Sequence, residues 1–124
     1  MLPLETLFHD GTYLCYGTFV ESKLAALRRG MLEPVVLATV ENESHYAGEI
    51  AQILRRAGFP VQDGTLHPLL NRLRREGLVT HEWQESAAGP PRKYLALSDE
   101  GRRQLTEFRN YLRDLAWMVD SIGG

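Results

Sequence analysis

Residues 61–94 read VQDGTLHPLLNRLRREGLVTHEWQESAAGPPRKY, and this stretch determines the fold that we expect. Its first half places four leucines at helical spacing, so at about 100° per residue they share one apolar stripe. These leucines are Leu66, Leu69, Leu70 and Leu73. The opposite face carries Gly64, Pro68, Asn71, Arg72 and Arg75, with His67 and Arg74 on one flank and Thr65 on the other. We therefore predict a helix that buries its leucines and presents the other face to the major groove of DNA.

A β-hairpin is predicted directly after this helix. Gly77 ends the helix, and residues 78–83 alternate with the period of a strand. A loop over residues 87–93 then leads to a second short strand over residues 94–97. Helix, hairpin and basic loop make a winged helix. Arg92 and Lys93 are expected at the base of the wing, where cations can meet phosphates or reach a minor groove.

These motifs carry a resemblance to a known family. The strings DGTLHPLLNRLRREGLV and ESAAGPPRKYLALSDEGRRQL are similar to the signature of the PadR family of bacterial transcriptional regulators. The preceding RRGMLEPVVLATV and HYAGEIAQILRRAGFPV fit the same pattern, so the resemblance extends from Leu24 to about Trp117. His67 and Leu95 stand where the family usually has tyrosines, and residues 46–49 are a variant of its Tyr-Gly-Tyr-Glu element. These departures concern the operator contacts and leave the fold unchanged.

The resemblance implies a fold class and a function. The fold is mainly α with a small β-wing, a winged helix-turn-helix of the short subfamily with one C-terminal dimerisation helix. The function is that of a DNA-binding transcriptional regulator. The residues expected at the DNA are Thr65, His67, Pro68, Asn71, Arg72, Arg75, Arg92 and Lys93.

Composition indicates one domain and excludes several classes of protein. The chain has 124 residues and 44% hydrophobic content, enough for a modest core that would gain from dimerisation. Its net charge is −2, but residues 45–93 carry seven Lys/Arg against five Asp/Glu, so the basic excess lies in the winged-helix segment. The acidic start and the lack of an apolar run of about 20 residues predict neither export nor a membrane span, and favour a cytoplasmic protein.

Cofactor and metal chemistry is not expected. Cys15 is the only cysteine, which excludes an internal disulfide and a cysteine-rich zinc site. The four histidines show no ligand spacing, so we predict no metal site. No nucleophile, acid–base pair or phosphate loop is recognisable either, and Ser98 is explained as a helix cap. The sequence therefore does not predict an enzyme.

Three segments are expected along the chain. Residues 1–20 form an N-terminal extension, read either as a hairpin turning at Asp10-Gly11 or as a mobile leader. Residues 21–97 form the winged helix-turn-helix domain. Its first helix spans residues 21–40, and its second helix spans residues 46–56 with Ser44 as the N-cap. Gln62 or Asp63 caps the recognition helix, and the helices that contain Pro34 and Pro68 are expected to kink or begin near these prolines.

Residues 98–124 form the last helix and the expected dimerisation element. Apolar residues recur there at alternating spacings of three and four, as in a coiled-coil seam. They are Leu105, Phe108, Leu112, Leu115, Val119 and Ile122. The partner of this stripe is the first helix of the same chain, a second copy of the chain, or both. We favour a two-fold dimer, which would place two recognition helices about one DNA turn, roughly 34 Å, apart.

An effector site is expected between the dimerisation helices. Several PadR-like proteins bind flat aromatic or phenolic compounds between dimer helices, and the resemblance implies such a site here. Its candidate residues are Phe108, Tyr111 and Trp117. Trp117 falls away from the seam, so we expect it to cover the first helix or the N-terminal segment, while Trp83 is expected to pack. The preferred function is a dimeric repressor released from a palindromic operator by an effector. The alternative is a winged-helix module for protein contacts, with its arginines serving solubility.

Overall fold

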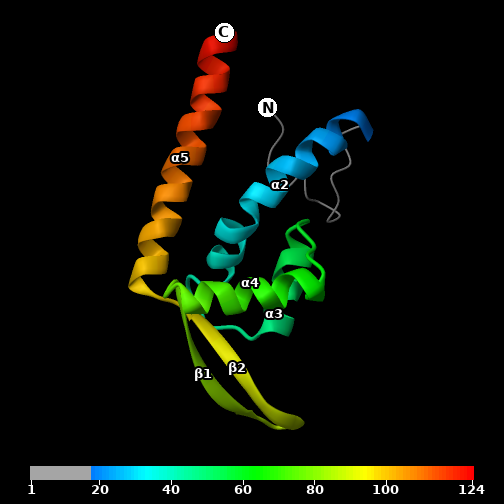
Figure 1. The fold of residues 1–124 in the computed structure, drawn as a ribbon, viewed down its shortest axis with the longest axis vertical. Coiled ribbons are helices and arrows are strands. Elements are labelled where there is room, and N and C mark those ends of the chain that lie inside the picture. Colours follow the sequence, from blue (N-terminus) through cyan, green and yellow to red (C-terminus); the bar gives the residue numbers. More distant parts are fainter. Residues whose placement is uncertain (1–17) are drawn as a thin grey trace.

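The computed structural model describes residues 18–124, with side chains from Ser22 onward. Residues 1–17 of the expected N-terminal hairpin lie outside these described residues, and residues 18–20 belong to a helix rather than to a strand. The elements are α2 (Thr18–Thr39), α3 (Ala47–Arg56), α4 (Asp63–Arg75), β1 (Val79–Ser86), β2 (Gly89–Leu97) and α5 (Asp99–Gly123). Figure 1 shows the β-hairpin projecting from one end of the helical body, while α5 extends in the opposite direction. The predicted mainly helical fold with a two-stranded wing is confirmed.

The hydrophobic core lies where α2, α3 and α4 meet the base of the hairpin. All four leucines of the α4 stripe are buried, and Leu66 and Leu73 are 0% exposed. They pack with buried residues of α2 and α3, such as Leu37 and Ile50. Burying a leucine side chain stabilises the folded state by about 1.5–3 kcal/mol, so this stripe accounts for the packing of α4 against the other helices. The predicted inward face of α4 is confirmed.

The two prolines lie inside their helices. Pro34 lies within α2 and Pro68 within α4. These helices begin at Thr18 and Asp63, which lie more than one helical turn before the prolines. The interpretation in which each helix begins near its proline is therefore wrong. Gln62 occupies the N-cap position of α4, as predicted, although its side chain makes no capping hydrogen bond.

The start of α3 differs from the prediction. Tyr46, rather than Ser44, is the N-cap, and the first helical residue is Ala47. The reason is a short β-bridge, in which His45 N donates to Leu95 O at 3.0 Å and Leu95 N donates to His45 O at 2.9 Å. Because residue 45 must stay extended to make this bridge, the helix cannot start at Ser44. The bridge joins the beginning of α3 to the edge of β2.

The wing is longer than predicted. β1 has 8 residues and β2 has 9, and their antiparallel register pairs Trp83 with Lys93 and Gln84 with Arg92. The expectation that Arg92 and Lys93 belong to a loop is therefore wrong, since both lie on β2. The hairpin extends beyond the core (Figure 1), and Trp83, which was expected to pack, is 62% exposed.

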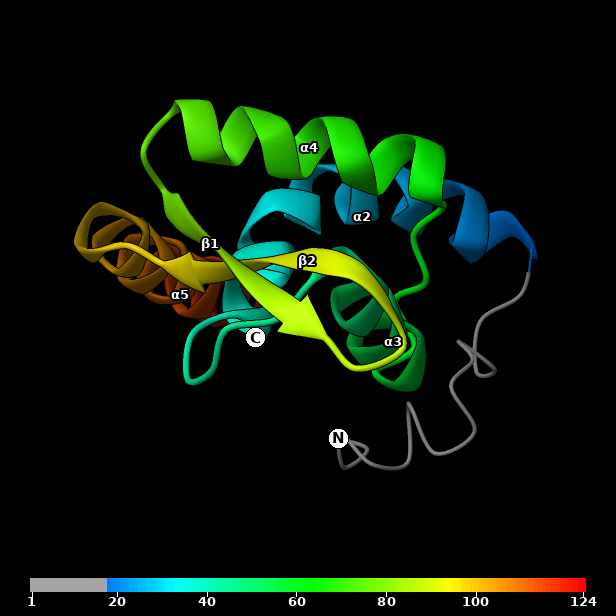
Figure 2. The ribbon, with the colours of Figure 1, turned by 90° about the horizontal axis from the view of Figure 1, so that it is seen from below.

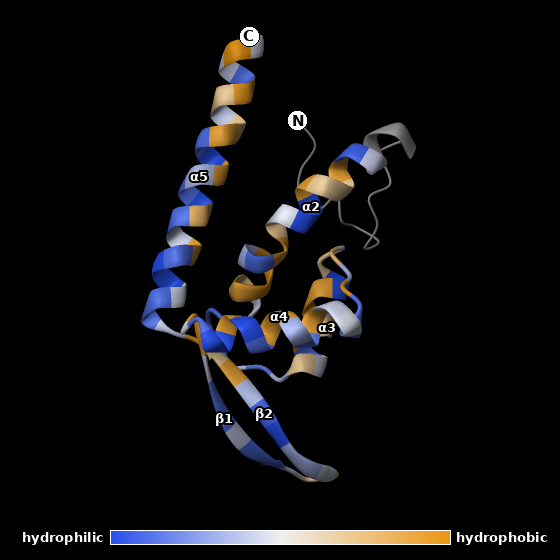
Figure 3. Cartoon of the chain, in the orientation of Figure 1, coloured by the Kyte–Doolittle hydropathy of each residue, from blue (hydrophilic) through white to orange (hydrophobic). Residues whose placement is uncertain are grey.

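α5 is fixed to the body by its first turns. Ser98 Oγ accepts a hydrogen bond from Gly101 N at 3.0 Å and donates one to Gly77 O at 2.6 Å, so the predicted cap is confirmed. Leu105 is 2% exposed and belongs to the core of the chain. It is therefore not available to a partner, and its assignment to an intermolecular seam is wrong. Figure 3 shows hydrophobic residues continuing along α5 to its C-terminal end.

A forked ion pair holds the middle of α5 against the turn after α2. Arg109 Nη1 and Nη2 donate to Glu41 Oε2 and Oε1 at 2.7 and 2.8 Å. The Arg109 hydrogen bonds lower the pKa of Glu41 below its ordinary value of 4.5, with a smaller contribution from the charge of Arg102. The same pairing raises the pKa of Arg109. Two hydrogen bonds in one plane fix the direction of α5 as well as its distance.

This pair predicts a loss of stability in acid. Glu41 has a lower pKa in the folded chain than in the unfolded one, so its contribution is present above pH 4.5 and is lost as the pH falls through the folded value. Because Arg109 is 47% exposed, the pair contributes only about 0.5–1 kcal/mol. We expect Glu41→Gln to lower the unfolding free energy by that amount at pH 7 and to have a smaller effect near pH 3. Urea unfolding at both pH values measures the difference, and an equal effect at both would contradict the assignment.

Candidate nucleic-acid interface

The outward face of α4 is polar and uncovered. Except for Arg74, which is partly buried, the residues that sequence analysis assigned to this face and its flanks are exposed, whereas the four leucines are not. They are Gly64, Thr65, His67, Pro68, Asn71, Arg72 and Arg75. Figure 2 shows α4 along one edge of the molecule, with α2, α3 and the hairpin on its inner side. This face is therefore open to a large partner.

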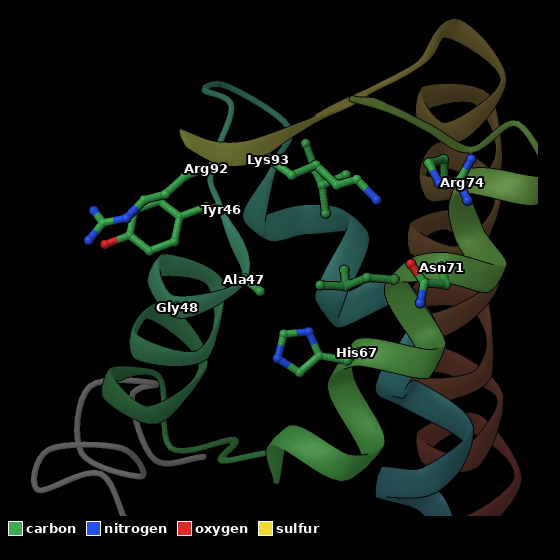
Figure 4. Close-up of a pocket in the computed structure, with 10 residues that line it drawn as sticks. Tyr46, Ala47, Gly48, His67, Asn71, Arg74, Arg92 and Lys93 are labelled. Atoms are coloured by element: carbon green, nitrogen blue, oxygen red, sulfur yellow. The ribbon is translucent and has the colours of Figure 1, made fainter. Parts of the chain in front are cut away.

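One flank of α4 borders a hollow of about 350 Å³, which we call the wing-side hollow. It lies between the start of α3, α4 and β2 (Figure 4). Its lining consists of Tyr46, Ala47, Gly48, His67, Leu70, Asn71, Arg74, Arg92, Lys93 and Leu95. Three of these side chains are cations and none of the lining residues is acidic. The wing-side hollow is therefore suited to an anionic partner.

Arg74 lines this hollow, although the sequence did not predict it as a site residue. The sequence placed it on a flank of α4 and did not include it among the residues expected at the DNA. Its Nε is buried and has no hydrogen-bond partner within the described part of the chain. Helical periodicity puts Arg74 on the same flank as His67, but the sequence gives no signal that this flank faces the wing. Tyr46, on the opposite wall, was not identified as a site residue either.

The other flank of α4 borders a second hollow, of about 480 Å³, against α2. We call it the α2-side hollow, and its lining includes Thr65, Pro68, Arg72 and Arg75 from α4. Arg72 Nη2 lies 2.9 Å from Glu33 Oε2. Arg72 Nε also lies 3.7 Å from Glu76 Oε2. Arg72 is thus engaged by carboxylates, whereas Arg75 pairs with none within residues 22–124.

The structure therefore divides the eight predicted DNA contacts into two groups. One group lines the wing-side hollow and consists of His67, Asn71, Arg92 and Lys93. The other lines the α2-side hollow and consists of Thr65, Pro68, Arg72 and Arg75. The outward ridge of α4 separates the groups. A ligand that contacted both would have to lie across the helix, as a duplex in a groove-binding orientation does.

The residues expected at a dimer and an effector site lie along α5. Phe108, Leu112 and Leu115 are partly buried, and Val119 and Ile122 are 69% and 80% exposed. A hollow of about 290 Å³ is lined by Gln104, Glu107, Phe108 and Tyr111, and Trp117 does not contribute to it. Trp117 is 71% exposed, so the expectation that it covers the first helix is wrong, and the alternative that it covers the N-terminal segment concerns residues outside the described range.

Within residues 18–124, no group of three or more His, Cys, Asp or Glu side chains could hold a metal ion. No helix in that range is both long enough and apolar enough to cross a membrane.

The chain matches the family described as "Transcriptional regulator PadR-like family" over residues 36–107, more than half of its length. It belongs to this family. A transcriptional regulator of Mycobacterium tuberculosis is 41% identical over 84 residues, which are 68% of this chain and 75% of the relative. The structure of a PadR family transcriptional regulator from Eggerthella lenta is 35% identical, with a TM-score of 0.75, over 84% of this chain and 91% of that one.

The PadR-like fold is also found in a structure determined with a nucleic acid. Bacillus subtilis PadR in complex with operator DNA matches with a TM-score of 0.60 and 18% identity. The match covers 63% of this chain and 47% of that chain. The resemblance inferred from the sequence motifs is confirmed, and this PadR-like chain is a member of a family of transcriptional regulators rather than of enzymes.

Proposed function

We propose that this PadR-like regulator is a repressor that binds a palindromic operator as a dimer and is released by a small effector. The observation that carries the proposal is the outward face of α4, polar and uncovered, which continues into the cation-lined wing-side hollow. The operator complex of Bacillus subtilis PadR, a protein of the same fold, supports it. The regulator would act in the cytoplasm, where operator DNA lies.

Base recognition is assigned to the outward face of α4, on both sides of its ridge. Asn71 and Arg75 are exposed there, and their side chains suit adenine and guanine edges in the major groove. Arg72 contributes less, because a contact with DNA would have to compete with Glu33 and Glu76. Thr65, His67 and Pro68 complete the surface that faces the groove. Lys93 and Arg92 on the wing are assigned to phosphates, which position the protein without reading the sequence.

We expect Arg75→Ala to weaken operator binding about tenfold, because a bidentate contact between an arginine and a base contributes about 1–3 kcal/mol of discrimination. The probe is a duplex selected by the wild-type protein from a random library, and affinity is measured by fluorescence anisotropy. Arg113→Ala removes an equal charge from an exposed site on α5, where Arg113 donates to Asn110, and should leave the affinity nearly unchanged.

The proposal fails if the wild-type protein selects no duplex, or if Arg75→Ala and Arg113→Ala bind the selected duplex equally well. Either result would favour the alternative, in which the winged helix serves protein contacts. The salt dependence gives a second measure, since non-specific attraction by charge alone would fall equally for the two variants.

Dimerisation is assigned to α5, with residues 21–97 binding DNA and residues 98–124 pairing the chains. The seam proposed here runs from Phe108 through Leu112 and Leu115 to Val119 and Ile122, without Leu105. An apolar stripe this exposed is costly in water unless a partner covers it. A two-fold axis through this helix would produce two recognition helices for the two halves of a palindrome.

The effector is assigned to the space beside this seam. Tyr111 and Trp117 are 61% and 71% exposed, and Phe108 lines the hollow of about 290 Å³ on α5. The rings of Phe108 and Tyr111 suit a flat aromatic or phenolic compound, whereas Trp117 lies nine residues beyond Phe108 and therefore on the other side of the helix. To act as an effector, the compound needs only a different affinity for two dimer geometries, with a coupling of about 1–3 kcal/mol.

A further inference from the structure

We propose that Tyr46 is a positioning residue, whose ring holds the guanidinium of Arg92 in place for a phosphate of the DNA backbone. This inference rests on the proposed DNA-binding function. Arg92 Cζ lies over the Tyr46 ring, 4.4 Å from its centroid. Figure 4 shows the two side chains together at one wall of the wing-side hollow.

The Tyr46 ring is itself confined by its neighbours. A Cβ added at Gly48 would come within 2.8 Å of Tyr46 Cε2 and 3.4 Å of Cδ2, so the ring lies directly on this glycine. The Tyr94 ring meets Tyr46 edge to face, with centroids 5.5 Å apart and planes at 73°. Glycine, tyrosine and arginine therefore surround the ring, and a side chain larger than glycine at position 48 would displace it.

The backbone of Tyr46 is also fixed. Its N–H donates to Glu49 Oε1 at 3.3 Å, and its carbonyl accepts from Ile50 N at 3.0 Å. The residue before it, His45, is hydrogen-bonded in both directions to Leu95 on β2. Because both the ring and its backbone are held, Tyr46 provides a rigid platform that joins α3 to the wing.

Stacking leaves the donors of Arg92 free. A guanidinium that lies on an aromatic face uses its flat side, while its N–H groups point outward in the plane. Within residues 22–124 no carboxylate forms an ion pair with Arg92, and the side chain is exposed. Its donors are therefore available for a bidentate contact with a phosphate, and the ring restricts the rotamers that would otherwise be lost on binding.

Lys93 provides a matched comparison on the same strand. Successive residues of β2 point to opposite faces, so Lys93 does not share the Tyr46 platform, and its Nζ lies 5.9 Å from the Trp83 ring centroid instead. The contribution of Lys93 to DNA binding should therefore be independent of Tyr46, whereas that of Arg92 should depend on it.

The experiment measures binding of the selected duplex over a salt series for Tyr46→Phe, Tyr46→Leu, Tyr46→Ala, Arg92→Ala and the double variants. We expect Tyr46→Phe to bind within about twofold of wild type, because it keeps the aromatic face. Tyr46→Leu, Tyr46→Ala and Arg92→Ala should each lose about threefold to tenfold in affinity, and the slope of log K against log salt should become shallower by up to about 0.9, the value for one phosphate contact. Tyr46→Ala/Arg92→Ala should resemble Arg92→Ala alone, whereas Tyr46→Ala/Lys93→Ala should show additive losses.

Three results would overturn the inference while leaving the proposed function intact. One is a wild-type salt slope in Tyr46→Leu, a variant that keeps apolar bulk and guards against misfolding of Tyr46→Ala. Another is full additivity between Tyr46→Ala and Arg92→Ala. A third is equal loss in Tyr46→Phe and Tyr46→Leu, which would assign the contact to the tyrosine hydroxyl. Failure of the wild-type protein to bind any selected duplex would reject the proposed function itself.

Discussion

Replacing Gly101 with alanine is expected to lower the free energy of unfolding by about 2–3 kcal/mol, although alanine usually stabilises a helix relative to glycine. Gly101 is buried in the first turn of α5, where this helix crosses the base of the hairpin. A Cβ there would come within 2.7 Å of Leu97 Cδ1 and 3.0 Å of the Leu78 carbonyl carbon, and still closer to the Leu78 oxygen. The backbone would have to shift to admit it.

The measurement is urea unfolding at a fixed protein concentration, since stability depends on concentration in a dimer. Gly30→Ala is the matched control, because Gly30 lies inside α2 and a Cβ there would meet nothing within 4 Å. We expect Gly30→Ala to raise the unfolding free energy by up to about 1 kcal/mol. If both variants stabilise the protein, the close approach of α5 to the hairpin is not as tight as the structure indicates.

The double variant Val119→Asp/Ile122→Asp is expected to be monomeric and to bind the selected operator at least about 100-fold more weakly. Val119 and Ile122 are 69% and 80% exposed on α5, so the single chain loses little packing when they are replaced. Two aspartates on each helix would place four like charges in the proposed seam, where they would repel one another. Loss of the dimer removes the avidity of two linked DNA contacts, which contributes about 10²–10⁴ in affinity.

Sedimentation analysis measures the oligomeric state, and fluorescence anisotropy measures the affinity. The control is Asn110→Asp/Ser121→Asp, which adds the same two charges to exposed positions on the opposite side of α5. This control should remain dimeric and bind DNA nearly as well as the wild type. A dimer that persists in Val119→Asp/Ile122→Asp would show that the chains pair through another surface.

The helical part of the fold could be predicted because its signals are local. The spacing of the leucines from Leu66 to Leu73 determines which face of α4 is buried, and the glycine after α4 and Ser98 before α5 mark helix ends. The wing was predicted less well. Gly89, Pro90 and Pro91 suggested a loop, but a strand can begin with prolines where no partner needs their N–H groups.

The candidate site depends on tertiary contacts, which helical periodicity does not predict. Helical spacing assigns Arg72 to the outward face of α4 and Arg74 to one flank, but only the packing shows that α2 borders Arg72 and the wing borders Arg74. The same limit applies to α5. Leu105 continues the heptad pattern, yet the core of its own chain buries it, since an apolar repeat does not say whether its partner is internal. The contact between Arg92 and Tyr46 joins residues that are far apart in the sequence, so no local sequence pattern predicts it.

The hydrogen bond from Ser98 Oγ to Gly77 O places the root of α5 one residue past the C-cap of α4. Ser98 N also donates to Leu78 O, so two bonds join the same short junction. A rotation of α5 about its first turn would therefore directly displace the C-terminal end of α4. In the proposed dimer, a change in the angle between the two α5 helices would move the two α4 helices through this junction. The rest of the protein core would not have to change.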